Sequence, residues 1–140
     1  MSLLPVDEAL ARILSSAEPH GSEQVPLTSA GGRVVAEPVK AHLLQPPFDC
    51  SAMDGYALIS PENISYPLEL TVIGESAAGK RFDGQLGEGQ AVRIFTGAPM
   101  PAGADSIVIQ EDTERSDDKL KIRQGLDKGR HIRRAGLDFA

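Results

Sequence analysis

The chain has 140 residues, which is enough for one compact domain or two small ones and excludes a large multidomain machine. Its net charge of −6 disfavours binding to a nucleic-acid backbone, and no apolar run approaches the ~18 residues that a membrane-spanning helix needs. The single cysteine excludes an intrachain disulfide and a thiolate zinc cluster, so we expect Cys50 to be a small buried thiol in a cytoplasmic protein. We therefore expect neither nucleic-acid nor membrane partners.

The first forty residues predict one helix followed by extended chain. Apolar residues recur with helical spacing at Val6, Leu10, Ile13, Leu14 and Ala17. This stripe predicts a helix over about residues 5–17, since Pro5 suits the first turn and Pro19 stops the run. We further expect Thr28 to cap a short helical turn and residues 33–40 to be extended.

From residue 46 onward, short β-type runs alternate with turns rich in glycine, proline and acidic residues. The expected strands cover residues 53–59, 68–73, 91–95, 106–110 and 119–123, and residues 116–118 form a hairpin turn before the last of them. The predicted fold class is α+β, with a β-rich barrel-like or twisted-sheet domain inserted into a smaller helix-plus-strand domain. The inserted domain covers residues 43–124, and the smaller one covers residues 1–42 and 125–140.

Charge is segregated along the second half of the chain. Residues 105–118 hold six acids and one base, whereas residues 119–134 hold seven bases and one acid. Cross-strand ion pairs explain this pattern without any ligand. The alternative is an oxyanion or phosphate site, which would take its donors from Arg130, His131, Arg133 and Arg134.

Residues 46–57 do not read like an ordinary connection. Two prolines restrict the approach, and the Ser51 hydroxyl and the Asp54 carboxylate lie three residues apart before Gly55. An aspartate on a rigid loop can bind Mg²⁺ or act as a base. Asp-Gly is also a common turn dipeptide, so a purely structural interpretation of Asp54 stays open.

A second unusual segment, residues 96–105, follows an expected strand. Its small residues and prolines would let backbone N–H groups and the Thr96 hydroxyl approach a ligand closely. The segment contains neither a P-loop nor a dinucleotide fingerprint, and a wide turn between strands is the alternative. The three histidines, His20, His42 and His131, lack the spacing of metal ligands, and we expect them to be surface or packing residues.

Three segments together resemble the N-terminal part of the molybdopterin molybdenumtransferase family, the MoeA-like proteins related to the E domain of gephyrin. They are PPFDCSAMDGYAL at 46–58, RIFTGAPMPAGADSIVIQED at 93–112 and GRHIRRAGLDF at 129–139. The resemblance covers essentially the whole chain. It implies that molybdate is inserted into adenylylated molybdopterin with release of AMP, assisted by a divalent ion, usually Mg²⁺.

The resemblance also implies functional residues. Asp54 would bind the metal or transfer a proton, Thr96 would bond an anionic oxygen, and Asp138 would bind the metal or set the polarity of the site. Cofactor contacts would come from Ser51, Gly97 and Arg133. Leu137 stands where the family usually has a glutamate, so one neighbouring carboxylate is missing.

Members of this family are longer and act as elongated dimers, with a third domain that binds molybdopterin and a fourth, β-rich domain. The resemblance therefore implies that these 140 residues supply one wall of an active site and do not catalyse alone. The implied partners are a second copy and a molybdopterin adenylyltransferase-like enzyme. Two alternatives remain, a non-catalytic interaction scaffold and a stand-alone anion-binding β module.

Overall fold

The computed structural model describes residues 3–18 and 20–140, so Pro19 lies outside the described residues. The chain divides into two compact units, residues 1–40 and residues 41–140. Residues 125–140 fall in the second unit in this division, and their predicted membership of an N-terminal domain stays a prediction. None of the described helices is long and apolar enough to cross a membrane.

In the first unit, α1 spans Val6–Leu14 and ends three residues earlier than predicted. The Ser15 and Ser16 hydroxyls donate to the carbonyls of Arg12 and Ile13, and such bonds satisfy the acceptors that a helix end leaves free. The apolar stripe exists, but no residue of α1 is buried.

A 3₁₀ turn, η1, spans Leu27–Ser29, so Thr28 lies inside the turn that we expected it to cap. Pro26 stands at the cap position, and no side chain there bonds the first N–H groups. The prediction for Thr28 is therefore wrong. Both short helices of this unit begin after a proline and have no side-chain cap, because the fixed φ of proline, −58° before α1 and −56° before η1, already suits a helix start.

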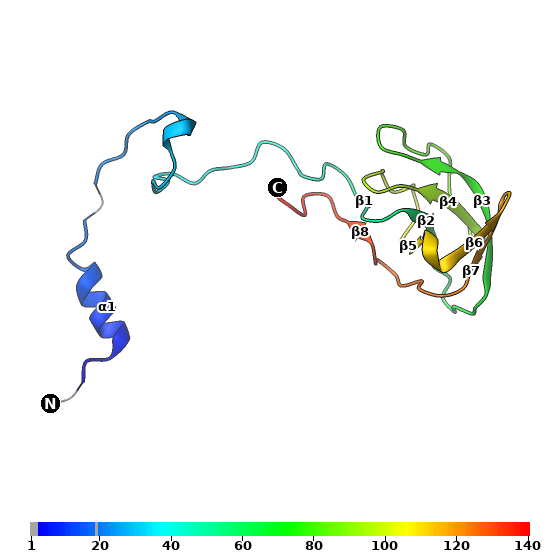
Figure 1. Ribbon diagram of the computed structural model, residues 1–140, viewed down its shortest axis with the longest axis horizontal. Helices are drawn as coiled ribbons and strands as arrows, with labels where there is room; N and C mark the ends of the chain where they lie inside the picture. Colours follow the sequence, from blue (N-terminus) through cyan, green and yellow to red (C-terminus); the bar gives the residue numbers. More distant parts are fainter. Residues whose placement is uncertain (1–2, 19) are drawn as a thin grey trace. The chain divides into compact units, whose positions relative to one another are not determined.

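The second unit is built on strands. Their bounds are β1 Cys50–Ser51, β2 Gly55–Leu58, β3 Leu68–Ser76, β4 Gln90–Ile94, β5 Ser106–Ile109, β6 Thr113–Ser116, β7 Lys119–Ile122 and β8 Ile132–Arg133. Six of them form a curled half-barrel sheet in the order β5-β2-β4-β3-β7-β6, with β3 and β4 parallel and the other pairs antiparallel (Figure 1). A second, two-stranded sheet pairs β1 with β8. The prediction of an α+β fold with a β-rich twisted sheet is confirmed.

The predicted strands are present with shifted ends. β2 starts two residues late, and β3 continues to Ser76 past a bulge at Val72/Gly74. The predicted hairpin turn is confirmed, because Ser116 pairs with Lys119 across a two-residue loop. Asp117 in that loop has a φ of 54°, as the tight turns of hairpins require.

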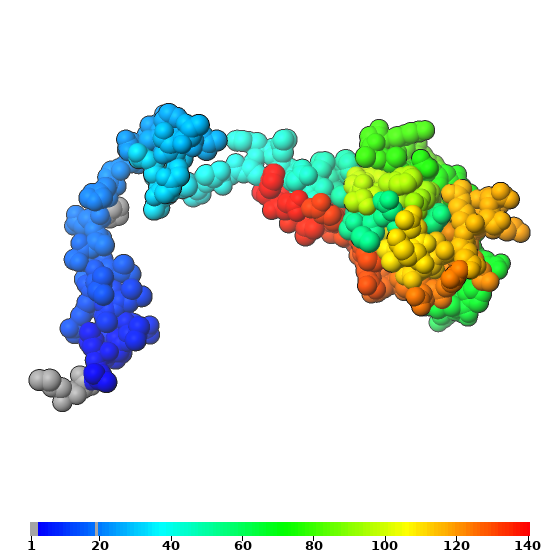
Figure 2. All heavy atoms as spheres, in the orientation of Figure 1, coloured from blue at the N-terminus to red at the C-terminus, as the bar shows by residue number. Residues whose placement is uncertain are grey.

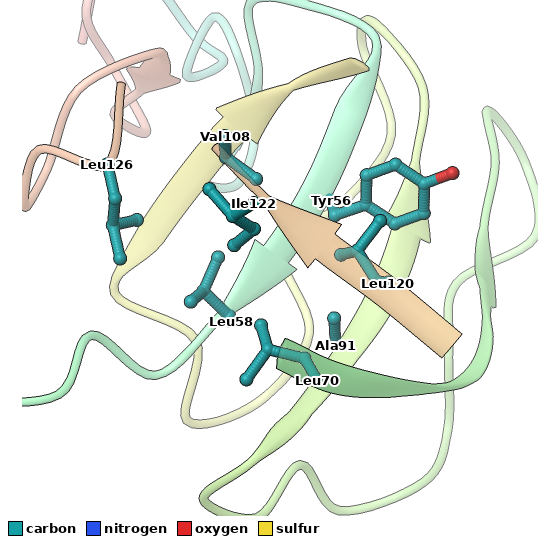
Figure 3. Packing of buried hydrophobic residues seen from close by; sticks show 8 residues of the cluster. All are labelled: Tyr56, Leu58, Leu70, Ala91, Val108, Leu120, Ile122 and Leu126. Atoms are coloured by element: carbon teal, nitrogen blue, oxygen red, sulfur yellow. The ribbon is translucent and has the colours of Figure 1, made fainter. Parts of the chain in front are cut away.

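Both faces of the central strands are buried, since successive side chains of a strand point to opposite sides. The larger cluster contains Tyr56, Leu58, Leu70, Ala91, Val108, Leu120, Ile122 and Leu126 (Figure 3). The smaller cluster contains Ala57, Ile94, Ala98 and Ile107, and Met100, Ala104 and Ile132 pack against it. The loop after β4 therefore covers the second face of the sheet. Cys50 is buried, as expected.

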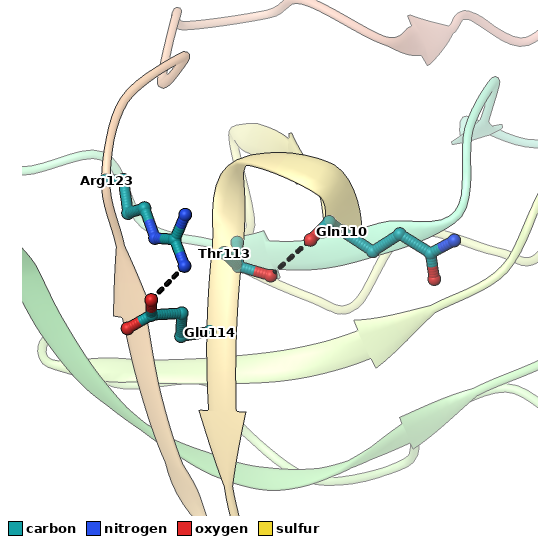
Figure 4. Close-up of polar contacts among 4 residues, drawn as sticks. All are labelled: Gln110, Thr113, Glu114 and Arg123. Carbon is teal, nitrogen blue, oxygen red and sulfur yellow. Dashed lines mark hydrogen bonds and ion pairs between the residues drawn. The ribbon is translucent and has the colours of Figure 1, made fainter.

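Two ion pairs join the acidic residues 105–118 to the basic residues 119–134, as the structural interpretation expects. Glu114 of β6 pairs with Arg123 after β7, close to the bond from the Thr113 hydroxyl to the Gln110 carbonyl (Figure 4). Lys128 pairs with Asp105 at 3.0 Å. Such partly exposed pairs contribute only about 0.2–1 kcal/mol each, so they select partners more than they stabilise.

Gly55 has less room for a side chain than any other glycine of the described residues, because a methyl group there would lie 2.0 Å from the carbonyl oxygen of Val108 on β5. We expect Gly55→Ala to lower the free energy of unfolding by about 1–3 kcal/mol or more, as overpacking does. Urea unfolding followed by circular dichroism measures it. Gly31→Ala is the control, since an added methyl group there meets nothing within 4 Å. Equal stability of the two variants would contradict the prediction.

Candidate functional site

The two unusual loops lie side by side. The Ser51 N–H donates to the Ala98 carbonyl at 3.0 Å, and the Gly97 N–H donates back to the Ser51 carbonyl at 2.8 Å. One step further, the Met100 N–H donates to the Asp49 carbonyl at 2.9 Å. Residues 46–54 and 96–100 thus form an irregular ladder that continues the pairing of the sheet.

The third segment of the resemblance lies against the first. β8 pairs with β1, and the ladder continues through bonds from the Gly136 N–H to the Pro46 carbonyl and from the Asp138 N–H to the Gln45 carbonyl. The space-filling view shows this contact, with the C-terminal residues in red beside the segment before β1 in cyan (Figure 2). All three segments therefore meet in the second unit.

Asp54 and Thr96 are brought together, because β2 and β4 pair antiparallel with Gly55 opposite Ile94. Asp54 precedes β2 and Thr96 follows β4, so both lie at the same end of the strand pair. The Asp54 Oδ1 atom accepts two hydrogen bonds at 2.8 Å, one from the Thr96 N–H and one from its hydroxyl. Asp54 is half-buried and Thr96 is exposed, so the pair lies at an accessible rim.

These contacts determine the charge of the carboxylate. The Thr96 N–H, then the Thr96 hydroxyl and the charge of Arg93, lower the pKa of Asp54 below its usual value, against a smaller opposing effect of burial. Asp54 is therefore ionised at neutral pH and is a weak base, which suits a group that accepts hydrogen bonds or meets a cation better than one that takes up a proton. Thr96 already donates its hydroxyl proton, so its oxygen remains as an acceptor.

Two predicted cofactor contacts lie in the frame of these loops. Ser51 is fully buried, and its hydroxyl bonds the Met53 carbonyl and accepts from the Met53 N–H. Gly97 is exposed, but its N–H is held by Ser51, and its φ of 80° favours glycine. The structure does not bring the Ser51 hydroxyl to the surface, so this side chain shapes the loop that carries Asp54.

Arg133 and Asp138 form an ion pair with each other. Nη2 of Arg133 donates to both carboxylate oxygens of Asp138, at 2.7 and 2.6 Å, and this contact raises the pKa of Arg133. The Asp138 N–H bonds the Gln45 carbonyl, before β1 in the chain. Asp54 follows β1 and so lies at the opposite end of that strand. The structure therefore does not bring Asp138 to Asp54, and an anion at Arg133 would compete with Asp138.

Asp49 is an anchor of these loops that the sequence motifs did not single out. Its Oδ1 accepts from the Ala135 N–H at 2.9 Å and its Oδ2 from Arg134 at 2.5 Å. These bonds, the backbone one first, lower the pKa of Asp49. The opposite charges of Asp49 and Arg134 could have suggested the pair, but only the pairing of β1 with β8 makes them neighbours.

A resident Mg²⁺ ion does not fit the side chains of this chain alone. Across residues 3–18 and 20–140, no three histidine, cysteine, aspartate or glutamate side chains gather as metal ligands do. Asp138 is paired with Arg133, and Asp54 uses Oδ1 for Thr96. Mg²⁺ needs close to six oxygen ligands, and the side chains described above cannot supply them alone.

Residues 4–140 match the protein family described as MoeA N-terminal region (domain I and II). A molybdopterin molybdenumtransferase 2 of Mycobacterium tuberculosis is 44% identical over 123 residues, 83% of this chain and 30% of that protein. The molybdopterin molybdenumtransferase of Haemophilus influenzae is 36% identical over 138 residues, 97% of this chain and 34% of that protein.

A crystal structure of the molybdopterin biosynthesis MoeA protein from Pyrococcus horikoshii OT3 superposes with a TM-score of 0.72 at 36% identity, covering 99% of this chain and 38% of that one. The chain thus spans 30–38% of the length of these three relatives.

The anchor at Asp49 has a testable pH dependence. Because its folded pKa is lowered, its stabilisation is present above the ordinary pKa of an aspartate and is lost as the pH falls through the folded value. We expect Asp49→Ala to cost about 1 kcal/mol at pH 7, allowing for partial exposure, and less below about pH 4. Urea unfolding at both pH values measures it.

The control for this test is Asp83→Ala, because the Asp83 side chain is 87% exposed. A loss of stability for Asp49→Ala that stays constant from pH 7 to pH 3, or that equals the loss for Asp83→Ala, would count against the anchor.

Proposed function

We propose that, since this chain belongs to the family of MoeA N-terminal regions, the protein that carries it inserts molybdate into adenylylated molybdopterin and releases AMP. One observation carries the proposal. Asp54 and Thr96, from two segments of the resemblance, bond each other at an accessible rim that three loops support. The chain provides one wall of the site, and the molybdopterin-binding wall comes from polypeptide outside these residues.

The chemistry at this wall follows from its charges. The ionised Asp54 would orient a donor group or a cation that accompanies the phosphates, and Thr96 would hold Asp54 in place while its oxygen faces the substrate. Arg134 and Arg133 are paired with Asp49 and Asp138, so an incoming phosphate would recruit them only by opening an ion pair. Asp138 enters the proposal as the partner of Arg133.

The remaining parts of the proposal concern the assembly. The parent protein would act in the cytoplasm as a homodimer, with molybdate and adenylylated molybdopterin as substrates and a Mg²⁺ ion bound mainly by groups outside this chain. A molybdopterin adenylyltransferase-like enzyme would supply the adenylylated substrate. The names of the similar molybdopterin molybdenumtransferases support the two substrates, and the other parts are what the family resemblance implies.

Replacing Asp54 tests the proposal directly. In the full-length protein we expect Asp54→Asn to lower the rate of AMP release by at least about 10-fold, because the negative charge at the rim is lost while Thr96 keeps an acceptor. AMP is quantified by chromatography after addition of molybdate and Mg²⁺. The control is Asp83→Asn at an exposed position. Wild-type turnover of a folded Asp54→Asn protein would remove Asp54 from the site.

The isolated 140-residue chain is the second test. We expect no AMP release when it is mixed with adenylylated molybdopterin, molybdate and Mg²⁺, because the proposal gives this chain only one wall of the site and its described residues gather no set of metal ligands. The full-length protein under the same conditions is the positive control. Turnover by the isolated chain would show that these residues contain a complete site and would contradict the proposal that they form only one wall of it.

A further inference from the structure

Arg93 is the charged residue of β4, and nothing in the function proposed above uses it. It lies opposite Tyr56 of β2 in the register of the sheet. Its guanidinium carbon is 5.1 Å from the centre of the Tyr56 ring and 4.7 Å from the centre of the Phe95 ring. Contact with two aromatic rings restricts a side chain that would otherwise be flexible, because both rings attract the cation.

The guanidinium bonds two groups that adjoin the backbone at Asp54. Nη1 donates to the carbonyl of Gly55, the residue after Asp54, at 3.2 Å. Nη2 donates to the Oε1 atom of Gln110 at 2.7 Å. Gln110 in turn donates its backbone N–H to the carbonyl of Asp54 at 3.1 Å. Arg93 therefore connects β2 to the residue after β5, and each of its two contacts adjoins the carbonyl end of Asp54.

The guanidinium of Arg93 is not paired with a carboxylate among the described residues. Among the described residues, Arg93 forms no ion pair within 4.0 Å, although Glu75 of β3 lies opposite it in the register. Arg133 and Arg134, in contrast, are each paired with an aspartate. Arginine is often found in ion pairs with a carboxylate. Arg93 instead donates to the Gly55 carbonyl and to the Gln110 side-chain amide, both beside Asp54.

We propose that Arg93 is a positioning residue for Asp54, which holds the backbone at and directly after that residue through Gln110 and Gly55. Thr96 holds the carboxylate itself, so the two residues act on different parts of Asp54. A lysine cannot replace this function, since a single ammonium lacks the planar fork that reaches both acceptors. The catalytic consequence rests on the function proposed above, but the geometric statement does not.

The geometric test uses the 140-residue chain and amide hydrogen exchange measured by NMR. In Arg93→Met we expect the amides of Thr96 and Gln110, which both bond Asp54, to exchange about tenfold faster. The amides of Val92 and Ile107 in the sheet should keep their protection. Unchanged exchange at Thr96 and Gln110, or faster exchange at all four amides alike, would overturn the proposal, because the second result describes a general loss of stability.

Two further variants keep the test decisive if Arg93→Met does not fold. Arg93→Lys keeps the charge and loses the fork, and Gln110→Ala removes one of the two acceptors but leaves its backbone N–H in place. Both should accelerate exchange at the Thr96 amide more than in the control Arg81→Met, whose native side chain is 64% exposed. Exchange in Arg93→Lys equal to that of the unsubstituted chain would overturn the proposal.

The catalytic arm uses the full-length protein. We expect Arg93→Met to lower kcat for AMP release about 10- to 100-fold with little change in KM, because the Asp54 carboxylate would be misplaced. Arg93→Lys should recover only a small part of the lost kcat. A change confined to KM would show that Arg93 binds substrate and would overturn the positioning role. If Asp54→Asn proves harmless, the proposed role of Asp54 fails while the exchange measurements still decide the geometry.

Discussion

The pairing of β2 with β4 is the constraint on which the candidate site depends. Asp54 lies directly before one strand and Thr96 shortly after the other, and antiparallel pairing puts these two ends together. Gly55 allows the pairing to continue to β5, because its missing side chain leaves room for the carbonyl oxygen of Val108. A longer residue there would move β2 away from β5 and carry Asp54 with it.

The loop of residues 96–105 is held by burial as well as by hydrogen bonds. Ala98 belongs to the smaller core cluster, and Met100 and Ala104 pack against it. The segment that follows Thr96 is therefore part of the core of the second unit, although its sequence of small residues and prolines is typical of an open turn. The sheet covers one side of this loop. Thr96 is exposed, although the residues that follow it are packed against the core.

The ion pairs restrict what the basic C-terminal segment can do. Arg133 and Arg134 are each held by an aspartate, which links the segment to its own chain before any substrate arrives. Free donors in this segment are consequently fewer than the number of its basic residues suggests. Electrostatic contacts thus serve two purposes here, since those of Asp49 hold the loops together and those of Asp54 keep one carboxylate ionised at the rim.

The sequence by itself determined the α+β class, most strands, the hairpin turn at Asp117 and the family, because these depend on local patterns of apolar residues, turn residues and short motifs. It also identified Asp54 and Thr96, since both stand in those motifs. Only the tertiary structure decided that Asp54 and Thr96 touch, that Asp138 is paired with Arg133, and that Arg93 flanks Asp54. These contacts join residues five to 42 positions apart through strand pairing and loop closure, which no local pattern encodes.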